Sequence, residues 1–180
     1  FPKHQGPTGW QSAPTLVADF RFRWRRRRYP DRCLEAADFL AQLSQGLTDA
    51  PAREALAELV GSHGPAFRLA KFQLDASQRI LSGIGAERSQ ATLVSAGTGS
   101  GKTLAFYLPA LTRIAAHVRR DPPDSRWVKA LALYPRNELL KDQFVEVYGE
   151  ARRLDGWLRA HGRRKLLIAA LFSFTPHDAA

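Results

Sequence analysis

Eight consecutive residues near the middle of the chain have the types and spacing needed to hold a phosphate chain: Ala96, Gly97, Thr98, Gly99, Ser100, Gly101, Lys102 and Thr103. A glycine-rich turn lets several backbone N–H groups point inward around an anion. The Lys102 ammonium can then reach the outer phosphates of a nucleotide, and the Thr103 hydroxyl can bind Mg²⁺. The pattern therefore predicts a nucleotide-binding loop, called the phosphate loop below.

The residues on either side of the phosphate loop predict the elements that position it. Residues 91–95 are apolar and β-branched, which is typical of a buried strand. Residues 103–117 have the pattern of a helix. The loop is therefore expected between a strand and a helix, with the helix N-terminus directed at the bound anion.

The detailed form of the loop resembles motif I of superfamily 2 helicases, the DEAD/DEAH-box group, because it opens with Ala96 and carries Thr-Gly-Ser inside. Residues 104–111, which place Pro109 within the helix, resemble the first helix of the same group. Kinases, transport ATPases and GTPases share the phosphate loop but not this continuation. The resemblance implies a RecA-like α/β lobe that binds ATP and Mg²⁺.

A second segment supports this resemblance. Residues 128–134 predict another buried strand, followed by Pro135, Arg136 and Asn137, with a helix beginning at about Asn137. The segment resembles motif Ia, which implies contact with a nucleic-acid backbone. A helix N-terminus beside an arginine also forms a phosphate seat on physical grounds, although a plain strand-to-helix turn is the alternative. DEAD-box proteins carry Thr and Arg where this chain has Arg136 and Asn137, so the detailed contacts do not transfer.

Upstream of the loop, Gln73 lies in a stretch that resembles the segment where a family glutamine reads the adenine edge. A glutamine amide carries both a donor and an acceptor, which suits adenine. There are two alternatives: Gln78 is the residue that contacts adenine, or Gln73 is an ordinary surface residue of a helix. The aromatic residue that the family places well upstream of this glutamine has no clear counterpart, since the position is Leu56.

The charge of the chain indicates a polyanionic partner. The formal net charge is +10, and residues 20–29 alternate aromatic residues with arginine before becoming a run of arginine. One interpretation of this stripe, Arg21 to Arg28, is a nucleic-acid contact; an edge strand or a surface for an acidic protein are the alternatives. For the chain as a whole a nucleic-acid partner is expected, and the family resemblance favours DNA over RNA. Cys33 is the one cysteine, which excludes an internal disulfide. No apolar run reaches the length of a membrane span, and a cytoplasmic location is expected.

The order of expected elements divides the chain at residues 61–65. Residues 1–65 predict a basic, mostly helical accessory region with a tail at 1–14, a strand at 15–29 and helices at 31–45 and 49–60. Residues 66–180 alternate helices with strands, the last strand at 165–172, which predicts part of a three-layer lobe with a parallel sheet. Residues 137–158 predict one long helix or a broken pair.

The resemblance as a whole implies an ATP-dependent helicase or translocase. Residues 134–143 look nearer to bacterial DNA helicases, including ones from phage-defence and DNA-modification loci, than to RNA-remodelling DEAD-box proteins. The chain starts at Phe1 without methionine, and the family's acidic hydrolysis motif is not found after Lys102. We therefore expect a piece that ends within the first RecA-like lobe and binds ATP without hydrolysing it efficiently. A non-enzymatic nucleotide- and nucleic-acid-binding module, or another P-loop NTPase, are the alternatives.

Overall fold

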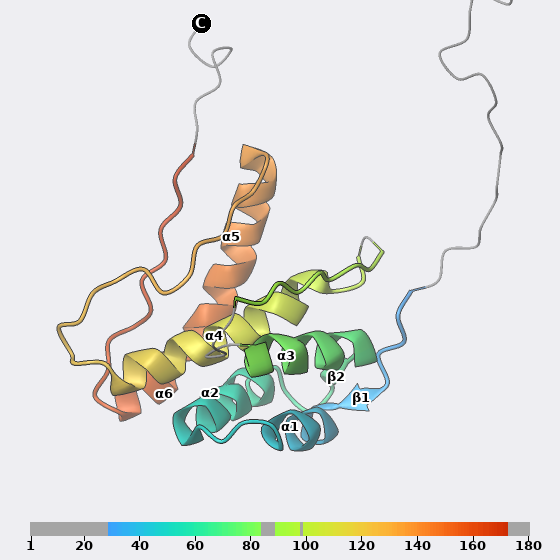
Figure 1. Cartoon of the computed structure of the whole chain (residues 1–180), viewed down its shortest axis with the longest axis horizontal. Helices are drawn as coiled ribbons and strands as arrows, with labels where there is room; N and C mark the ends of the chain where they lie inside the picture. The colour runs from blue at the N-terminus through green and yellow to red at the C-terminus, as the bar shows by residue number, and fades with distance from the viewer. Residues whose placement is uncertain (1–28, 84–88, 98, 173–180) are drawn as a thin grey trace, which may run out of the picture.

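The structure is a computed structural model that describes residues 29–83, 89–97 and 99–172, and most of its regular elements are helices (Figure 1). In chain order the elements are β1 (Leu34–Glu35), α1 (Ala36–Ser44), α2 (Ala50–Gly61), β2 (Arg68–Leu69), α3 (Lys71–Gly83), α4 (Lys102–Arg120), α5 (Asn137–Arg152) and α6 (Asp155–Ala160). The strands β1 and β2 pair antiparallel, with Leu34 opposite Leu69 and Glu35 opposite Arg68.

The hydrophobic core is built around α4, which packs against both α2 and α3. Apolar side chains from α1, α2, α4 and α6 are fully or almost fully buried in it, including Phe39, Leu56, Leu108 and Leu158. Removing such side chains from water is the main source of stability in a domain of this size. Helix α5 rises away from this helical body and has Ala151 as its buried residue (Figure 1). The helix that follows the phosphate loop is therefore also the central helix of the core.

Most of the predicted helices are confirmed. Helix α2 begins directly after Asp49 with a proline in its first turn, and α5 begins at Asn137. The stretch predicted as a long helix or a broken pair is a pair, α5 and α6. Asp49 makes no side-chain cap bond and instead pairs with Arg113, at 3.4 Å, and with Arg120. This ion-pair cluster joins the start of α2 to the second half of α4.

The predicted helix at 31–45 is wrong at its beginning, because α1 starts only at Ala36 and residues 34–35 form β1. Pairing with β2 holds this backbone extended, and the Arg68 guanidinium donates to Glu35 Oε1 at 3.0 Å. Such a partner is distant in sequence and leaves no local signal. Cys33, which falls within the range predicted as a helix, consequently precedes α1 and is exposed.

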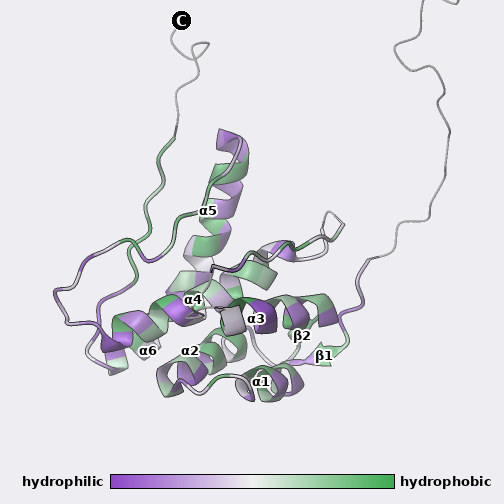
Figure 2. Ribbon diagram, viewed as in Figure 1, coloured by the Kyte–Doolittle hydropathy of each residue, from purple (hydrophilic) through white to green (hydrophobic). Residues whose placement is uncertain are grey.

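The predicted parallel three-layer sheet is not confirmed. Residues 91–95, 128–134 and 165–172 have no regular secondary structure, and in the described part of the chain the pair β1 and β2 is the sheet present. Many apolar side chains of these three segments are open to solvent, with Leu93 95%, Leu133 83% and Leu167 88% exposed, whereas Leu166 is buried in the core. Figure 2 shows the hydrophobic colouring of these segments. A strand has no hydrogen bonds within itself and requires a neighbour, so an apolar β-branched run alone does not produce a sheet.

Several expectations fall outside the described residues: the tail at 1–14, the strand at 15–28 with its Arg21 to Arg28 stripe, Thr98, and the residues after 172. The helices on the two sides of residues 61–65 pack together in one core, and the division of the chain at residue 65 stays a prediction. Within the described residues, no helix is both long and apolar enough to cross a membrane.

Candidate nucleotide-binding site

The phosphate loop forms a tight turn at the N-terminus of α4. The helix after the loop is the one that the sequence predicts, whereas residues 91–95 before it do not form the predicted strand. Gly99 and Gly101 have φ angles of 78° and 86°, in the left-handed region that side chains disfavour, and the Ser100 N–H donates to the Gly97 carbonyl at 3.2 Å. Gly101 is the N-cap residue of α4 and has no side chain to bond the first-turn amides. Those amides and the positive end of the helix dipole are therefore open to an anion.

The Lys102 side chain folds back over its own loop. Its ammonium donates to the carbonyl oxygens of Ala96, at 2.5 Å, and Gly97, at 2.9 Å. These bonds hold the positive charge at the opening of the turn, where the sequence predicted it. The same ammonium would have to leave these two carbonyls in order to contact an anion.

Two hydroxyl groups at the loop lack hydrogen-bond partners among the described residues. The Ser100 side chain is buried, at 3% exposure, and its Oγ has no partner. Thr103 lies in the first turn of α4, is half-buried, and makes no side-chain hydrogen bond within the described part of the chain. A buried hydroxyl without a partner costs about 1–3 kcal/mol, so a ligand that supplied a hydrogen bond to Ser100 Oγ would gain binding free energy there.

Gln73 connects the upstream segment to the phosphate loop. It lies in the first turn of α3, where its Oε1 accepts the Ala70 N–H at 2.8 Å in the manner of a capping box. Its Nε2 donates to the Gly101 carbonyl at 2.9 Å, and the residue is only 3% exposed. In this arrangement Gln73 positions the C-terminal end of the loop. Gln78, the other candidate, is exposed and lies 3.5 Å from the Gln42 carbonyl.

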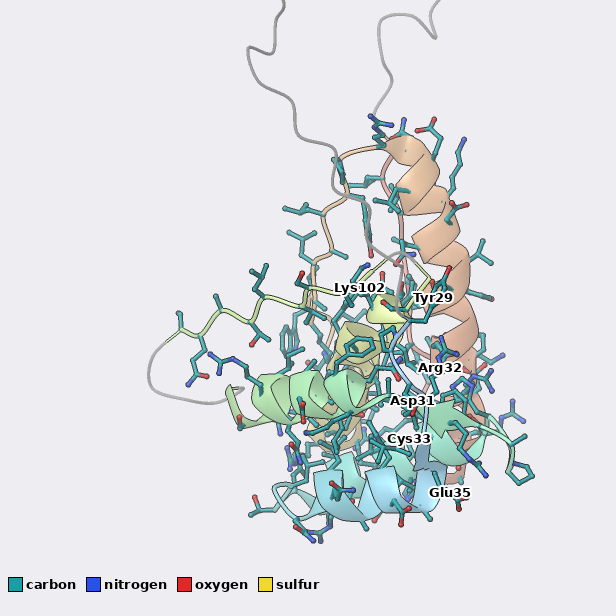
Figure 3. The ribbon with its side chains drawn as sticks, turned by 90° about the vertical axis from the view of Figure 1, so that its right-hand side faces the viewer. Tyr29, Asp31, Arg32, Cys33, Glu35 and Lys102 are labelled. Carbon is teal, nitrogen blue, oxygen red and sulfur yellow. The ribbon has the colours of Figure 1, made fainter. Side chains whose placement is uncertain are left out.

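A segment that the sequence did not assign to the site also reaches the loop. Residues 29–33 run from beside Lys102 down to β1 (Figure 3). With Gly99 and Ser100 they surround an open hollow of about 580 Å³, lined by Tyr29, Pro30, Asp31 and Arg32. A volume of this order matches small-molecule and cofactor sites. Residues 29–32 are far from residues 96–103 in the sequence. Sequence patterns relate only residues that are close together in the chain, so they could not have assigned this segment to the site.

The residues predicted to contact nucleic acid lie at the start of α5. Arg136 is its N-cap residue and is exposed, as is Pro135, while Asn137 is the first helical residue. The preceding residue, Tyr134, bonds through its hydroxyl to the Tyr107 hydroxyl on α4. Burial and this hydrogen bond raise the pKa of Tyr107 well above its ordinary value, so the contact is between neutral groups. The tyrosine pair thus holds the start of α5 against α4, and sequence reasoning had not singled it out.

A second, smaller hollow lies behind the loop, on the side of α5. His63 Nε2 is 3.0 Å from Glu150 Oε2, and both side chains are largely buried. Burial by itself raises the pKa of the Glu150 carboxyl, but the hydrogen bond and charge of His63, together with Arg153, lower it below its ordinary value. This pair ties the turn after α2 to α5. It lines the same hollow as Arg32, Gln73 and Gly101.

The described residues hold no group of three or more histidine, cysteine, aspartate or glutamate side chains that could bind a metal ion. The donors at the loop are hydroxyl groups, which are hard oxygen ligands of the kind Mg²⁺ prefers. Mg²⁺ is usually held by one or two protein oxygens together with substrate phosphates, and Thr103 fits that role. The site therefore suits a metal that arrives with a nucleotide.

Comparisons with known proteins agree with this geometry. The profile of the family described as DEAD/DEAH box helicase matches residues 70–160. The ATP-dependent RNA helicase rok1 of Aspergillus terreus is 39% identical over 62 residues, which are 34% of this chain and 8% of that protein. Druantia protein DruE of Escherichia coli is 34% identical over 82 residues, which are 44% of this chain and 4% of that protein. No solved structure matches significantly. The matched range holds Gln73, the phosphate loop and residues 135–137, whereas residues 29–35 precede it.

Proposed function

Because the chain belongs to the DEAD/DEAH box helicase family, whose ATP-binding domain has a RecA-like α/β fold, we propose that it is the ATP-binding part of a nucleic-acid helicase or translocase. It binds Mg-ATP through residues 96–103 and a nucleic-acid backbone through residues 135–137. The chain spans less than a tenth of each of the two curated relatives, so the activity of a whole protein is part of this proposal.

One observation carries the proposal: the phosphate loop lies at the free N-terminus of the central helix, with the Lys102 ammonium already at its opening. Lys102 binds the outer phosphates as a point charge, and the amides that begin α4 bind the phosphate oxygens. Thr103 holds Mg²⁺, which supplies charge neutralisation between the phosphates when it is bound. Gln73 keeps the end of the loop in place from α3. For Gln73 to hydrogen-bond adenine, its side-chain amide must first break its bond to the Ala70 N–H or its bond to the Gly101 carbonyl.

We also propose that residues 91–95, 128–134 and 165–172 pair as parallel strands of the RecA-like lobe in the working protein. The support is physical, because these segments expose Leu93, Leu133 and Leu167 almost fully. Large apolar side chains in a row are unfavourable in water and indicate surfaces that are covered in the working protein. Residues 1–65 are proposed as an accessory region, with residues 66–180 forming the RecA-like part.

The nucleic-acid half of the proposal makes Arg136 a backbone contact. Replacing it should weaken binding of a single strand severalfold and reduce the salt dependence of log K by about 0.7 units, the contribution of one phosphate on a single strand. The fold should be unaffected, because Arg136 is exposed and makes no side-chain cap bond to α5. Fluorescence anisotropy of labelled DNA and RNA oligonucleotides over a range of salt concentrations measures both quantities.

The matched control is Arg79→Ala, which removes the same charge from an exposed position on α3. Equal salt slopes for Arg136→Ala, Arg79→Ala and the unaltered chain would remove residues 135–137 from the nucleic-acid interface. Such a result would favour another P-loop NTPase, for which no strand contact is expected at this turn. The difference between the DNA and RNA titrations decides which strand the chain prefers.

A further inference from the structure

We propose that Arg32 contacts the phosphates of a nucleotide bound at the phosphate loop, as a second cation supplied by the segment that precedes β1. The inference rests on the proposed nucleotide site and adds a residue to it. Arg32 lies outside the range that matches the helicase family, so the contact is a feature of this chain's own N-terminal segment.

The Arg32 side chain lies close to Gly101, near the C-terminal end of the phosphate loop. A Cβ added to Gly101 would lie 3.1 Å from Arg32 Nη2 and 2.8 Å from Gln73 Nε2. The Arg32 guanidinium therefore packs against Gly101, the N-cap residue of α4 that directly precedes Lys102. Figure 3 shows Tyr29 and Arg32 on the same segment beside Lys102. Arg32 also borders both hollows around the loop, the larger one with Gly99 and Ser100.

In the part of the chain that the structure describes, no acidic side chain pairs with Arg32. Within the described residues its guanidinium makes no hydrogen bond and no ion pair, and its side chain is exposed. By contrast, Lys102 is bonded to two carbonyls, and the nearby Arg68 and Arg153 bond to Glu35 and Glu150. A guanidinium has five N–H donors in a planar fork that matches a phosphate group, so an unpaired one beside an anion site is suited to that ligand.

A separate observation indicates that the hollow takes a ligand. Ser100 lines the hollow with Arg32, and its Oγ is buried without a partner among the described residues. The hollow is thus lined by Arg32 and by Gly99 and Ser100 of the loop, and the amides at the start of α4 follow directly in sequence. An oxyanion satisfies the guanidinium, the hydroxyl and these amides, and a phosphate chain is long enough to bridge them.

The test is the affinity of the chain for Mg-ATP and Mg-ADP, measured by calorimetry for the unaltered chain, Arg32→Ala and Arg32→Lys. A charge-assisted hydrogen bond predicts that Arg32→Ala weakens both affinities about 10-fold or more. Arg32→Lys should recover part of the loss, because lysine keeps the charge but not the fork. The melting temperature should not change in either variant, since Arg32 is exposed and unpaired in the described structure.

Arg79→Ala is the matched control, with the same change of charge at an exposed site on α3, and should bind Mg-ATP as the unaltered chain does. If the unaltered chain binds Mg-ATP and Arg32→Ala binds it equally well, Arg32 is not a phosphate contact and the loop alone accounts for binding. A loss of affinity in Arg32→Ala that comes with a lowered melting temperature would assign Arg32 a structural role and overturn the inference. If the unaltered chain fails to bind Mg-ATP, the proposed function fails, and this inference falls with it.

Discussion

Lys102→Ala is expected to weaken Mg-ATP binding by roughly 10- to 100-fold, the range for a hydrogen bond to a charged group. The ammonium sits at the opening of the phosphate loop, held by the carbonyls of Ala96 and Gly97. No other described ammonium group bonds to the loop's carbonyls, so its loss removes the point charge for the outer phosphates. Calorimetric titration with Mg-ATP measures the change directly.

Lys71→Ala is the matched control for this variant. It removes the same charge from α3, where the lysine is exposed and, among the described residues, pairs with Asp75 in the next turn. An exposed pair of this kind contributes little, so the affinity for Mg-ATP should change less than about 2-fold. Equal affinities for Lys102→Ala and Lys71→Ala, with both variants folded, would contradict the assignment of residues 96–103 as the phosphate loop.

Gly101→Ala is the second substitution with a large expected effect, and it acts on stability as well as binding. A side chain at the φ of 86° costs about 1–2 kcal/mol. The new Cβ would also lie 2.8 Å from Gln73 Nε2, which is buried and donates to the carbonyl of residue 101 itself. Breaking that bond leaves a buried amide unpaired at a cost of about 1–3 kcal/mol. The free energy of unfolding should therefore fall by about 2–5 kcal/mol in denaturant titrations.

Gly97→Ala provides the comparison within the same loop. A Cβ at this position would meet nothing within 4 Å, and the φ angle of Gly97 does not lie in the positive range. Its unfolding free energy should change by less than about 0.5 kcal/mol. If Gly101→Ala were as stable as Gly97→Ala, the left-handed turn and the contact with Gln73 would not describe the loop in solution.

The helices could be predicted from the sequence because their signals are local. Asp49 with Pro51 marks the start of α2, and the helix that follows the phosphate loop needs only its own pattern. Strand formation depends on partners far away in sequence. Leu34 and Glu35 were therefore predicted as helix but form β1, because they pair with β2. The apolar run at 128–134 was predicted as a strand but has no strand partner among the described residues.

The candidate site divides in the same way. The phosphate loop could be predicted because spacing alone specifies its chemistry, and its glycines occupy the left-handed conformations that such a turn needs. The place of Arg32 at the site could not be predicted, because only the fold brings its side chain close to Gly101. The function of Gln73 was also beyond the sequence: its amide could equally read a base or bind backbone, and here it bonds Ala70 and Gly101.

The central claim is that residues 96–103 bind the phosphates of ATP, and calorimetric titration of the unaltered chain with Mg-ATP tests it most directly. The account predicts saturable binding of one nucleotide per chain with a Kd of about 1 mM or tighter, the range in which enzymes hold their substrates. Mg-ADP should compete for the same site, and removing Mg²⁺ with a chelator should weaken binding because Thr103 then loses its ion. A folded chain that shows no saturable binding of Mg-ATP in this range would contradict the claim.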